Sequence, residues 1–274
     1  MVAASHPTPS GAPPIITEVP IRPIGNADLR AALKEGWEDF MARRGDLIFI
    51  GLIYPLVGLV TAAAARGYST LPFLFPIAAG ISLLGPLVAS GFYELARRRE
   101  AGLESGWWHF FDVRKGPAFG QILMVAGLLI ALFLAWLATA GLIYQSFMGS
   151  TPPSSLGAFL RDLFTTPRGW GTIIVGNLAG LCFAIMVLTV SLVSLPMLVD
   201  RDIDAGTAIV TSVRAVRANA GTAARWGVIV AVLLVAGTIP FFLGLAVVLP
   251  LLGYATWHLY TRLVDRSALP EVRR

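Results

Sequence analysis

Residues 226–264 read WGVIVAVLLVAGTIPFFLGLAVVLPLLGYATWHLYTRLV, an apolar run of 39 residues. A single membrane crossing takes about 20 residues as a helix, so this run is too long for one span. Pro240 removes a backbone donor, and Gly237 and Gly244 loosen the chain around it. A tight helical hairpin is the favoured interpretation. The alternative is one bent helix with a re-entrant piece, which would place the C-terminus on the other side of the membrane.

The composition of the whole chain is that of a protein that crosses a membrane several times. Of its 274 residues, 56% are hydrophobic and only 14% are charged. A soluble domain carries about 25% charged residues. The apolar residues also come in blocks of about 20, long enough to cross a hydrocarbon core. We therefore predict an all-α fold, a polytopic membrane helix bundle.

We predict six transmembrane helices, arranged as three repeated hairpins with interfacial amphipathic helices between them. Residues 1–25 contain proline, serine and glycine but no apolar core segment, so they form a disordered tail and not a signal peptide. Residues 26–266 form a single membrane domain and residues 267–274 a C-terminal tail. The expected spans are 46–66, 71–96, 117–147, 169–199, 222–240 and 241–264.

The basic residues predict the orientation of these spans. With six spans, 18 of the 21 Lys and Arg residues fall on the side of the two termini, and only Arg66, Arg161 and Arg168 fall on the other. A five-span arrangement weakens the split to 14 against 7. Cytoplasmic loops are enriched in Lys and Arg, so both termini are expected in the cytoplasm. The excess positive charge therefore reflects topology, and we expect no nucleic-acid partner.

Three similar units are visible along the chain. Residues 27–44 place Leu29, Leu33, Trp37, Phe40 and Met41 on one helical face, which predicts a helix at the membrane surface. Residues 102–116 and 204–221 occupy the equivalent place before the third and fifth spans. Each even-numbered span also carries a proline, with a polar residue eight positions later. These pairs are Pro86 with Glu94, Pro196 with Asp204, and Pro250 with His258.

Three stretches resemble a known family. They are GWEDFMARRGDLIFIGLIYPLVG at 36–58, AIVTSVRAVRANAG at 208–221 and PLLGYATWHLYTRLVD at 250–265. They are similar to an uncharacterised family of bacterial integral membrane proteins, a domain of unknown function. The resemblance covers most of residues 20–266 and implies a multi-pass protein of the inner membrane. Some members carry a label similar to cytochrome c oxidase subunit I, and many have a histidine where this chain has Tyr254.

The oxidase label makes a demand on histidines that this chain does not meet. A catalytic oxidase subunit needs about six histidine ligands, whereas this chain has three, one of them His6 in the tail. His109 and His258 remain as weak candidates to hold a single haem. The favoured interpretation is a belt of histidine and aromatic residues at the membrane interface. No cofactor is expected.

Other polar residues have structural explanations. Apart from Asp46 at the first position of the first span, Glu94 is the only carboxylate placed inside a span, which makes it a functional candidate. Arg97 and Arg98 follow at i+3 and i+4 and predict an ion pair reaching the headgroups. Asp204 is expected to cap a helix. Cys182, the lone cysteine, is expected to be a small buried residue.

The sequence contains no nucleophile elbow, phosphate-binding loop or metal motif, so no enzyme is predicted. The expected function is an accessory, assembly or organising factor for other membrane complexes, with the lipid bilayer and such a complex as partners. One alternative is a small transporter or channel for a neutral or lipidic solute. Another is an oxidase-associated, haem-binding subunit. The residues expected to act as interface contacts are Glu94, Tyr254, His258 and Arg262.

Overall fold

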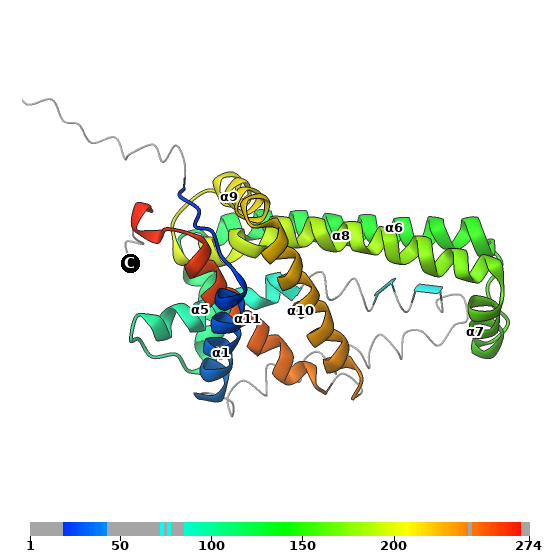
Figure 1. Cartoon of the computed structure of the whole chain (residues 1–274), viewed down its shortest axis with the longest axis horizontal. Coiled ribbons are helices and arrows are strands. Elements are labelled where there is room, and N and C mark those ends of the chain that lie inside the picture. The colour runs from blue at the N-terminus through cyan, green and yellow to red at the C-terminus, as the bar shows by residue number, and fades with distance from the viewer. Residues whose placement is uncertain (1–18, 43–71, 74–75, 78–84, 241–242, 270–274) are drawn as a thin grey trace, which may run out of the picture.

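The computed structural model describes residues 19–42, 72–73, 76–77, 85–240 and 243–269, and these parts are almost entirely helical. Two short 3-10 helices, η2 and η3, accompany the α-helices (Figure 1). The elements are α1 (Asn26–Ala42), α5 (Gly85–Glu100), η2 (Trp107–Lys115), α6 (Phe119–Met148), α7 (Leu156–Thr165), α8 (Pro167–Asp200), α9 (Ala205–Ala218), α10 (Ala220–Thr238), α11 (Leu245–Leu263) and η3 (Arg266–Ala268).

The helices α6 and α8 lie side by side along the long axis of the molecule, with α7 at the far end (Figure 1). Ser155 caps α7 by accepting from the amide of Ala158. Thr166 then caps α8, whose first residue is Pro167, a position where a missing amide proton costs nothing. The other helices gather at the opposite end of the pair.

Three helices are long and apolar enough to cross a membrane: α6, α8 and α10. They match three of the predicted spans to within about two residues at each end. The predicted span 46–66 lies outside the described residues, and the second predicted span is described as a long helix only from Gly85 onward. The helix α11 forms where predicted but does not meet the same criteria of length and apolarity. The described residues therefore contain three such helices, and not the full set of six.

The long apolar run breaks where the sequence predicts. The helix α10 ends at Thr238, α11 begins at Leu245, and the chain reverses between them (Figure 1). The two flanking glycines meet at this reversal: a Cβ added to Gly244 would lie 2.8 Å from the Cα of Gly237. The two glycines therefore allow the backbones on either side of the reversal to approach each other closely. From the sequence, they were expected to loosen the chain instead.

The three proline-containing helices α5, α8 and α11 pack against one another. Their shared core contains large side chains that are almost fully buried, among them Phe92, Leu195 and Trp257. The helices are close enough that a Cβ on Gly253 of α11 would lie 2.6 Å from the Cβ of Phe92. In the described parts of these helices, the side chains of α5, α8 and α11 therefore pack closely together.

Part of the predicted N-terminal tail belongs to this packed end. Residues 1–18 lie outside the described residues, but Ile21 pairs with Val264 in an isolated antiparallel bridge. The amide of Ile24 donates to Asn219 Oδ1 at 2.8 Å, and Val19 is buried. Residues 19–25, which the sequence assigns to the tail, therefore contact the packed end of the molecule.

Candidate functional site: the His258 cluster

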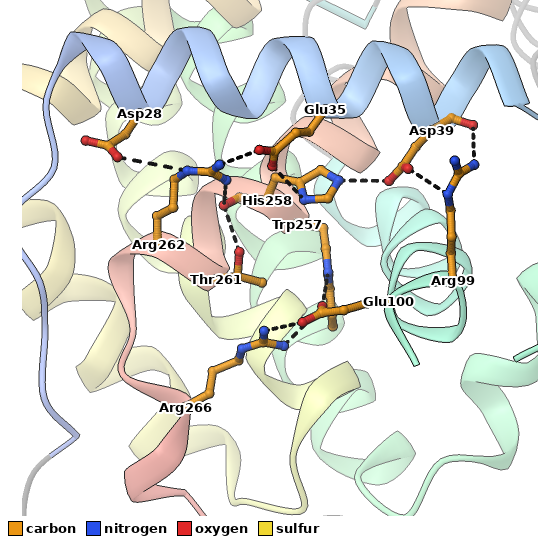
Figure 2. Close-up of polar contacts among 10 residues, drawn as sticks. All are labelled: Asp28, Glu35, Asp39, Arg99, Glu100, Trp257, His258, Thr261, Arg262 and Arg266. Atoms are coloured by element: carbon orange, nitrogen blue, oxygen red, sulfur yellow. Dashed lines mark hydrogen bonds and ion pairs between the residues drawn. The ribbon is translucent and has the colours of Figure 1, made fainter. Parts of the chain in front are cut away.

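The candidate site is a group of charged side chains where α1, α5 and α11 meet (Figure 2). The carboxylates come from α1 and from the end of α5, and the cations from α5, α11 and the turn after α11. We call this group the His258 cluster. Its members are Glu35, Asp39, Arg99, Glu100, His258, Arg262 and Arg266.

His258 lies between two carboxylates of α1. Its Nε2 is 2.8 Å from Asp39 Oδ2, and its Nδ1 is 3.2 Å from Glu35 Oε2. Both ring nitrogens of His258 therefore face a carboxylate oxygen. Glu35 and Asp39 are four residues apart, which places them on one face of α1, one above the other. The contacts of His258 with both side chains thus lie on the face of α1 that packs against α11.

Two arginines complete the charge balance around His258. Arg262 Nη2 lies 2.6 Å from Glu35 Oε1, and Arg262 Nη1 donates to the backbone oxygen of His258 at 2.9 Å. Arg99 Nε lies 2.9 Å from Asp39 Oδ1. The hydrogen bond from Arg262 holds the pKa of the Glu35 carboxyl below its ordinary value of 4.5. Glu35 and Asp39 therefore each contact an arginine from another helix, Arg262 of α11 and Arg99 of α5.

Glu100 forms the lower half of the cluster. It accepts from Trp257 Nε1 at 3.0 Å and pairs with Arg266 (Figure 2). Burial raises the pKa of Glu100, but the bonds from Arg266 and Trp257 outweigh burial and leave that pKa below its ordinary value. Next to it, the hydroxyl of Tyr260 donates to Asp200 at the end of α8 at 2.8 Å. These contacts connect α5, α8 and α11.

Glu94 is buried, with its side chain 1% exposed. Its carboxylate accepts two bonds from Arg97, at 2.8 and 2.9 Å, and Arg98 lies 3.8 Å away. The ion pairs expected from the i+3 and i+4 spacing are present, but Glu94 does not extend to the surface as expected. A cavity of about 10 Å³ lies beside it, room for about one water molecule.

His109 has its own carboxylate partner. Its Nδ1 lies 2.7 Å from Asp112 Oδ2, and Lys115 Nζ lies 2.6 Å from Asp112 Oδ1. The hydrogen bonds from His109 and Lys115 lower the pKa of Asp112 to about 2. The segment around His109 is the 3-10 helix η2 and not the amphipathic α-helix implied by the repeat.

The two histidine candidates for haem thus contact different carboxylates. Both ring nitrogens of His258 face Glu35 and Asp39, so an iron ligand there would require one of these contacts to break. Within the described part of the chain, no group of three or more His, Cys, Asp or Glu side chains is arranged to hold a metal ion.

Three further sequence candidates have clear positions. Tyr254 is buried, with its ring 6.0 Å from that of Phe92 in an edge-on arrangement. Asp204 caps α9 by accepting from the amide of Thr207 at 2.8 Å, as predicted. Cys182 is exposed on α8, so the expectation of a buried cysteine is wrong. The reason is that the apolar exterior of a membrane helix suits a thiol as well as a protein core does.

Sequence reasoning missed the carboxylates that hold His258. Residues 27–44 were expected to form a helix at the membrane surface, but Glu35 and Asp39 of this helix contact His258 of α11. A signal for this was available, since like charges at i and i+4 destabilise a helix unless a cation lies between them. The expected apolar face is itself divided: Leu29 and Phe40 are buried, whereas Trp37 is 45% exposed.

The chain is similar to one family of known sequences. Residues 74–200 match the family described as "Predicted integral membrane protein (DUF2189)". The resemblance to an uncharacterised integral membrane family is therefore confirmed over this region, which contains α5, α6, α7 and α8. No curated protein and no solved structure matches the chain.

Proposed function

We propose that this integral membrane protein is not an enzyme and that it organises other membrane proteins or assists their assembly. The observation that supports the proposal is the internal pairing of the His258 cluster. Its carboxylates and cations contact one another across α1, α5 and α11, an arrangement suited to holding helices together. Among the described residues, the exposed faces of the long helices offer surfaces for contact with other proteins.

The helix α8 offers the clearest contact surface. Ile174, Leu178, Leu181 and Ile185 are each more than half exposed. Their spacing of four, three and four residues places them on one face of the helix. In a membrane, this face contacts either lipid or another apolar helix.

We also propose six spans with both termini in the cytoplasm of the inner membrane. The distribution of Lys and Arg supports this orientation, with 18 of the 21 on the side of the termini. The reversal between α10 and α11 supports an even number of crossings.

Crosslinking from the native cysteine tests the assembly role. Cys182 is the only cysteine in the chain and lies exposed on the same side of α8 as Leu181 and Ile185. A benzophenone maleimide attached to Cys182 in native membranes, then illuminated, should give one discrete protein adduct with high yield. The matched control is Cys182→Ser combined with Leu142→Cys, which moves the label to an exposed position on α6. Adducts with lipid alone, or the same mixture from both positions, would contradict the proposal.

An absorbance spectrum of the purified protein separates this proposal from the haem-binding alternative. An assembly factor without a cofactor gives no Soret band, whereas a haem held by His109 or His258 gives one. The transporter alternative has its own readout, since it requires solute flux in proteoliposomes that falls when Glu94 is replaced. A Soret band or such a flux would overturn the assembly role.

A further inference from the structure

An apolar groove of about 440 Å³ runs between α1 and α10, with α11 at its base. All of its lining residues are apolar: Leu33 and Trp37 from α1, Val228, Ile229, Val232 and Leu233 from α10, and Leu251 from α11. Val228 and Val232 are about 60% exposed, so the groove is open along its length. Its apolar lining suits a hydrocarbon chain.

On each of the helices α1 and α10, an arginine lies about one turn before the first residue that lines the groove. Arg30 lies three residues before Leu33 on α1, and Arg225 lies three residues before Val228 on α10. Residues three and four apart share a helix face, so both arginines belong to the faces that form the groove. Arg225 Nη1 donates to Asn26 Oδ1 at 2.8 Å, which brings the beginnings of α1 and α10 together. Both arginines are therefore placed at the same end of the groove.

The two arginines are available to an anion. Both are exposed. Among the described residues Arg30 has no ion-pair partner, and Arg225 contacts a neutral amide. By contrast, Lys34 of the same helix is paired with Glu38. Guanidinium groups bind phosphate oxygens with two parallel hydrogen bonds. Two arginines without an acidic partner among the described residues therefore fit a phosphate.

We propose that this groove binds one anionic phospholipid, with its phosphate between Arg30 and Arg225 and an acyl chain along Val228 and Val232. The helix α10 is long and apolar enough to cross the membrane, and Arg225 lies near its beginning, at the depth of headgroups. The half-exposed Trp37 is a side chain that favours the same interface. Because lipid tails are as apolar as the groove, the arginines supply the preference for an anionic lipid.

Native mass spectrometry of the full chain in neutral detergent tests the proposal. Phosphatidylglycerol and phosphatidylcholine with identical acyl chains are the two probes. We expect one bound phosphatidylglycerol and a clear preference for it over phosphatidylcholine. The double variant Arg30→Gln, Arg225→Gln should reduce that preference about thirty-fold, since each arginine contributes about 1 kcal/mol to anionic lipid binding. The matched control Arg217→Gln removes an exposed arginine of α9, outside the groove, and should leave binding unchanged.

A second variant tests the groove independently of the arginines. Val232→Trp fills the groove while both arginines stay in place, and it should abolish retention of phosphatidylglycerol. Glycerol phosphate, which has no acyl chain, should compete poorly with the lipid in the unaltered chain. The proposal is overturned if both lipids bind equally, if the double variant behaves like Arg217→Gln, or if glycerol phosphate competes as well as the lipid.

Discussion

His258 is the residue that joins α11 to α1, through contacts of 2.8 Å to Asp39 and 3.2 Å to Glu35. We predict that His258→Gln lowers the free energy of unfolding by about 1–3 kcal/mol, because the buried carboxylate of Asp39 and the partly exposed carboxylate of Glu35 lose the ring between them. Thermal unfolding in detergent measures the change. As a control, Lys34→Gln removes one half of an exposed ion pair and should change stability by less than about 0.5 kcal/mol.

A double-mutant cycle with Asp39→Asn identifies the contact responsible. If His258 acts through Asp39, the double variant should lose less stability than the sum of the losses in the two single variants. Simple additivity of the two effects would show that the 2.8 Å contact does not stabilise the protein.

Acid should weaken two separate carboxylate contacts, those of Glu35 and Asp112. The hydrogen bond from Arg262 holds the pKa of Glu35 below its ordinary value of 4.5. The hydrogen bonds that Asp112 accepts lower its pKa from 3.8 to about 2. A lowered pKa in the folded state means that the stabilisation is fully present above the ordinary value and is lost as the pH falls through the folded pKa. We therefore predict a melting temperature that changes little between pH 7 and 5 and falls between pH 4 and 2. Replacing Glu35 with Gln should flatten this decline, and an equally steep curve would contradict its role.

At the scale of single residues, the sequence predicted positions better than partners. Asp204 caps its helix and Glu94 pairs with Arg97, both inferred from spacing within one helix. The partners of His258 come from more than 200 residues away, and no local pattern indicates which carboxylate a histidine will meet. Long-range contacts of this kind depend on how helices pack, which the sequence alone does not specify.

At the scale of the elements, α1 and α11 approach each other closely at Gly36. A Cβ at this position would lie 2.6 Å from the backbone nitrogen of Ala255, so the backbones would have to separate. We predict that Gly36→Ala destabilises the protein by about 1–3 kcal/mol, as overpacking does elsewhere. The melting temperature measures the loss, and limited proteolysis should show α1 becoming accessible.

A second glycine serves as the control for Gly36. Gly127 also lies within a helix, α6, but an added Cβ there meets nothing within 4 Å. Because alanine forms helices better than glycine, Gly127→Ala should leave stability unchanged or raise it. Equal losses in both variants would show that the contact with Ala255 is not the cause.

Helix boundaries were predictable where long apolar runs meet turn residues. The sequence places α6, α8 and α10 correctly because their blocks of apolar residues end at caps, prolines or glycines. It fails at η2, where Gly106 and Trp107 align with Gly36 and Trp37 but form a different helix. Gly36 packs against Ala255, whereas a Cβ on Gly106 would meet nothing, so the shared letters do not indicate a shared environment.

For the whole molecule, the proposed topology makes a direct prediction. Gly149 follows α6 at the end of the molecule next to α7, far from the packed N-terminal segment (Figure 1). Reporter fusions at Gly149 should be active only as periplasmic enzymes, and fusions at the C-terminus only as cytoplasmic ones. A C-terminus on the periplasmic side would overturn the six-span proposal and favour the re-entrant alternative.

The helical character of the molecule could be predicted from composition, but its uneven architecture could not. Apolar length alone indicates α6 and α8, and they extend as a pair away from the rest. By contrast, nothing in the sequences of α1 and α11 indicates that these two helices pack against each other. The sequence predicts only that α1 lies at the membrane surface. That arrangement depends on one small residue, Gly36, and on charges from three helices.

The contact between α1 and α11 can form only late in synthesis. Asp39 leaves the ribosome 219 residues before His258, its partner in the finished protein. During that interval α1 carries two carboxylates without the histidine that joins them, while the intervening helices insert one after another. The contacts of α1 therefore form only after α11 has been made. A chain that stops before residue 258 lacks the histidine that contacts Asp39 and Glu35. The bridge between Ile21 and Val264 then ties the two ends together, so the finished molecule should resist unfolding from either end.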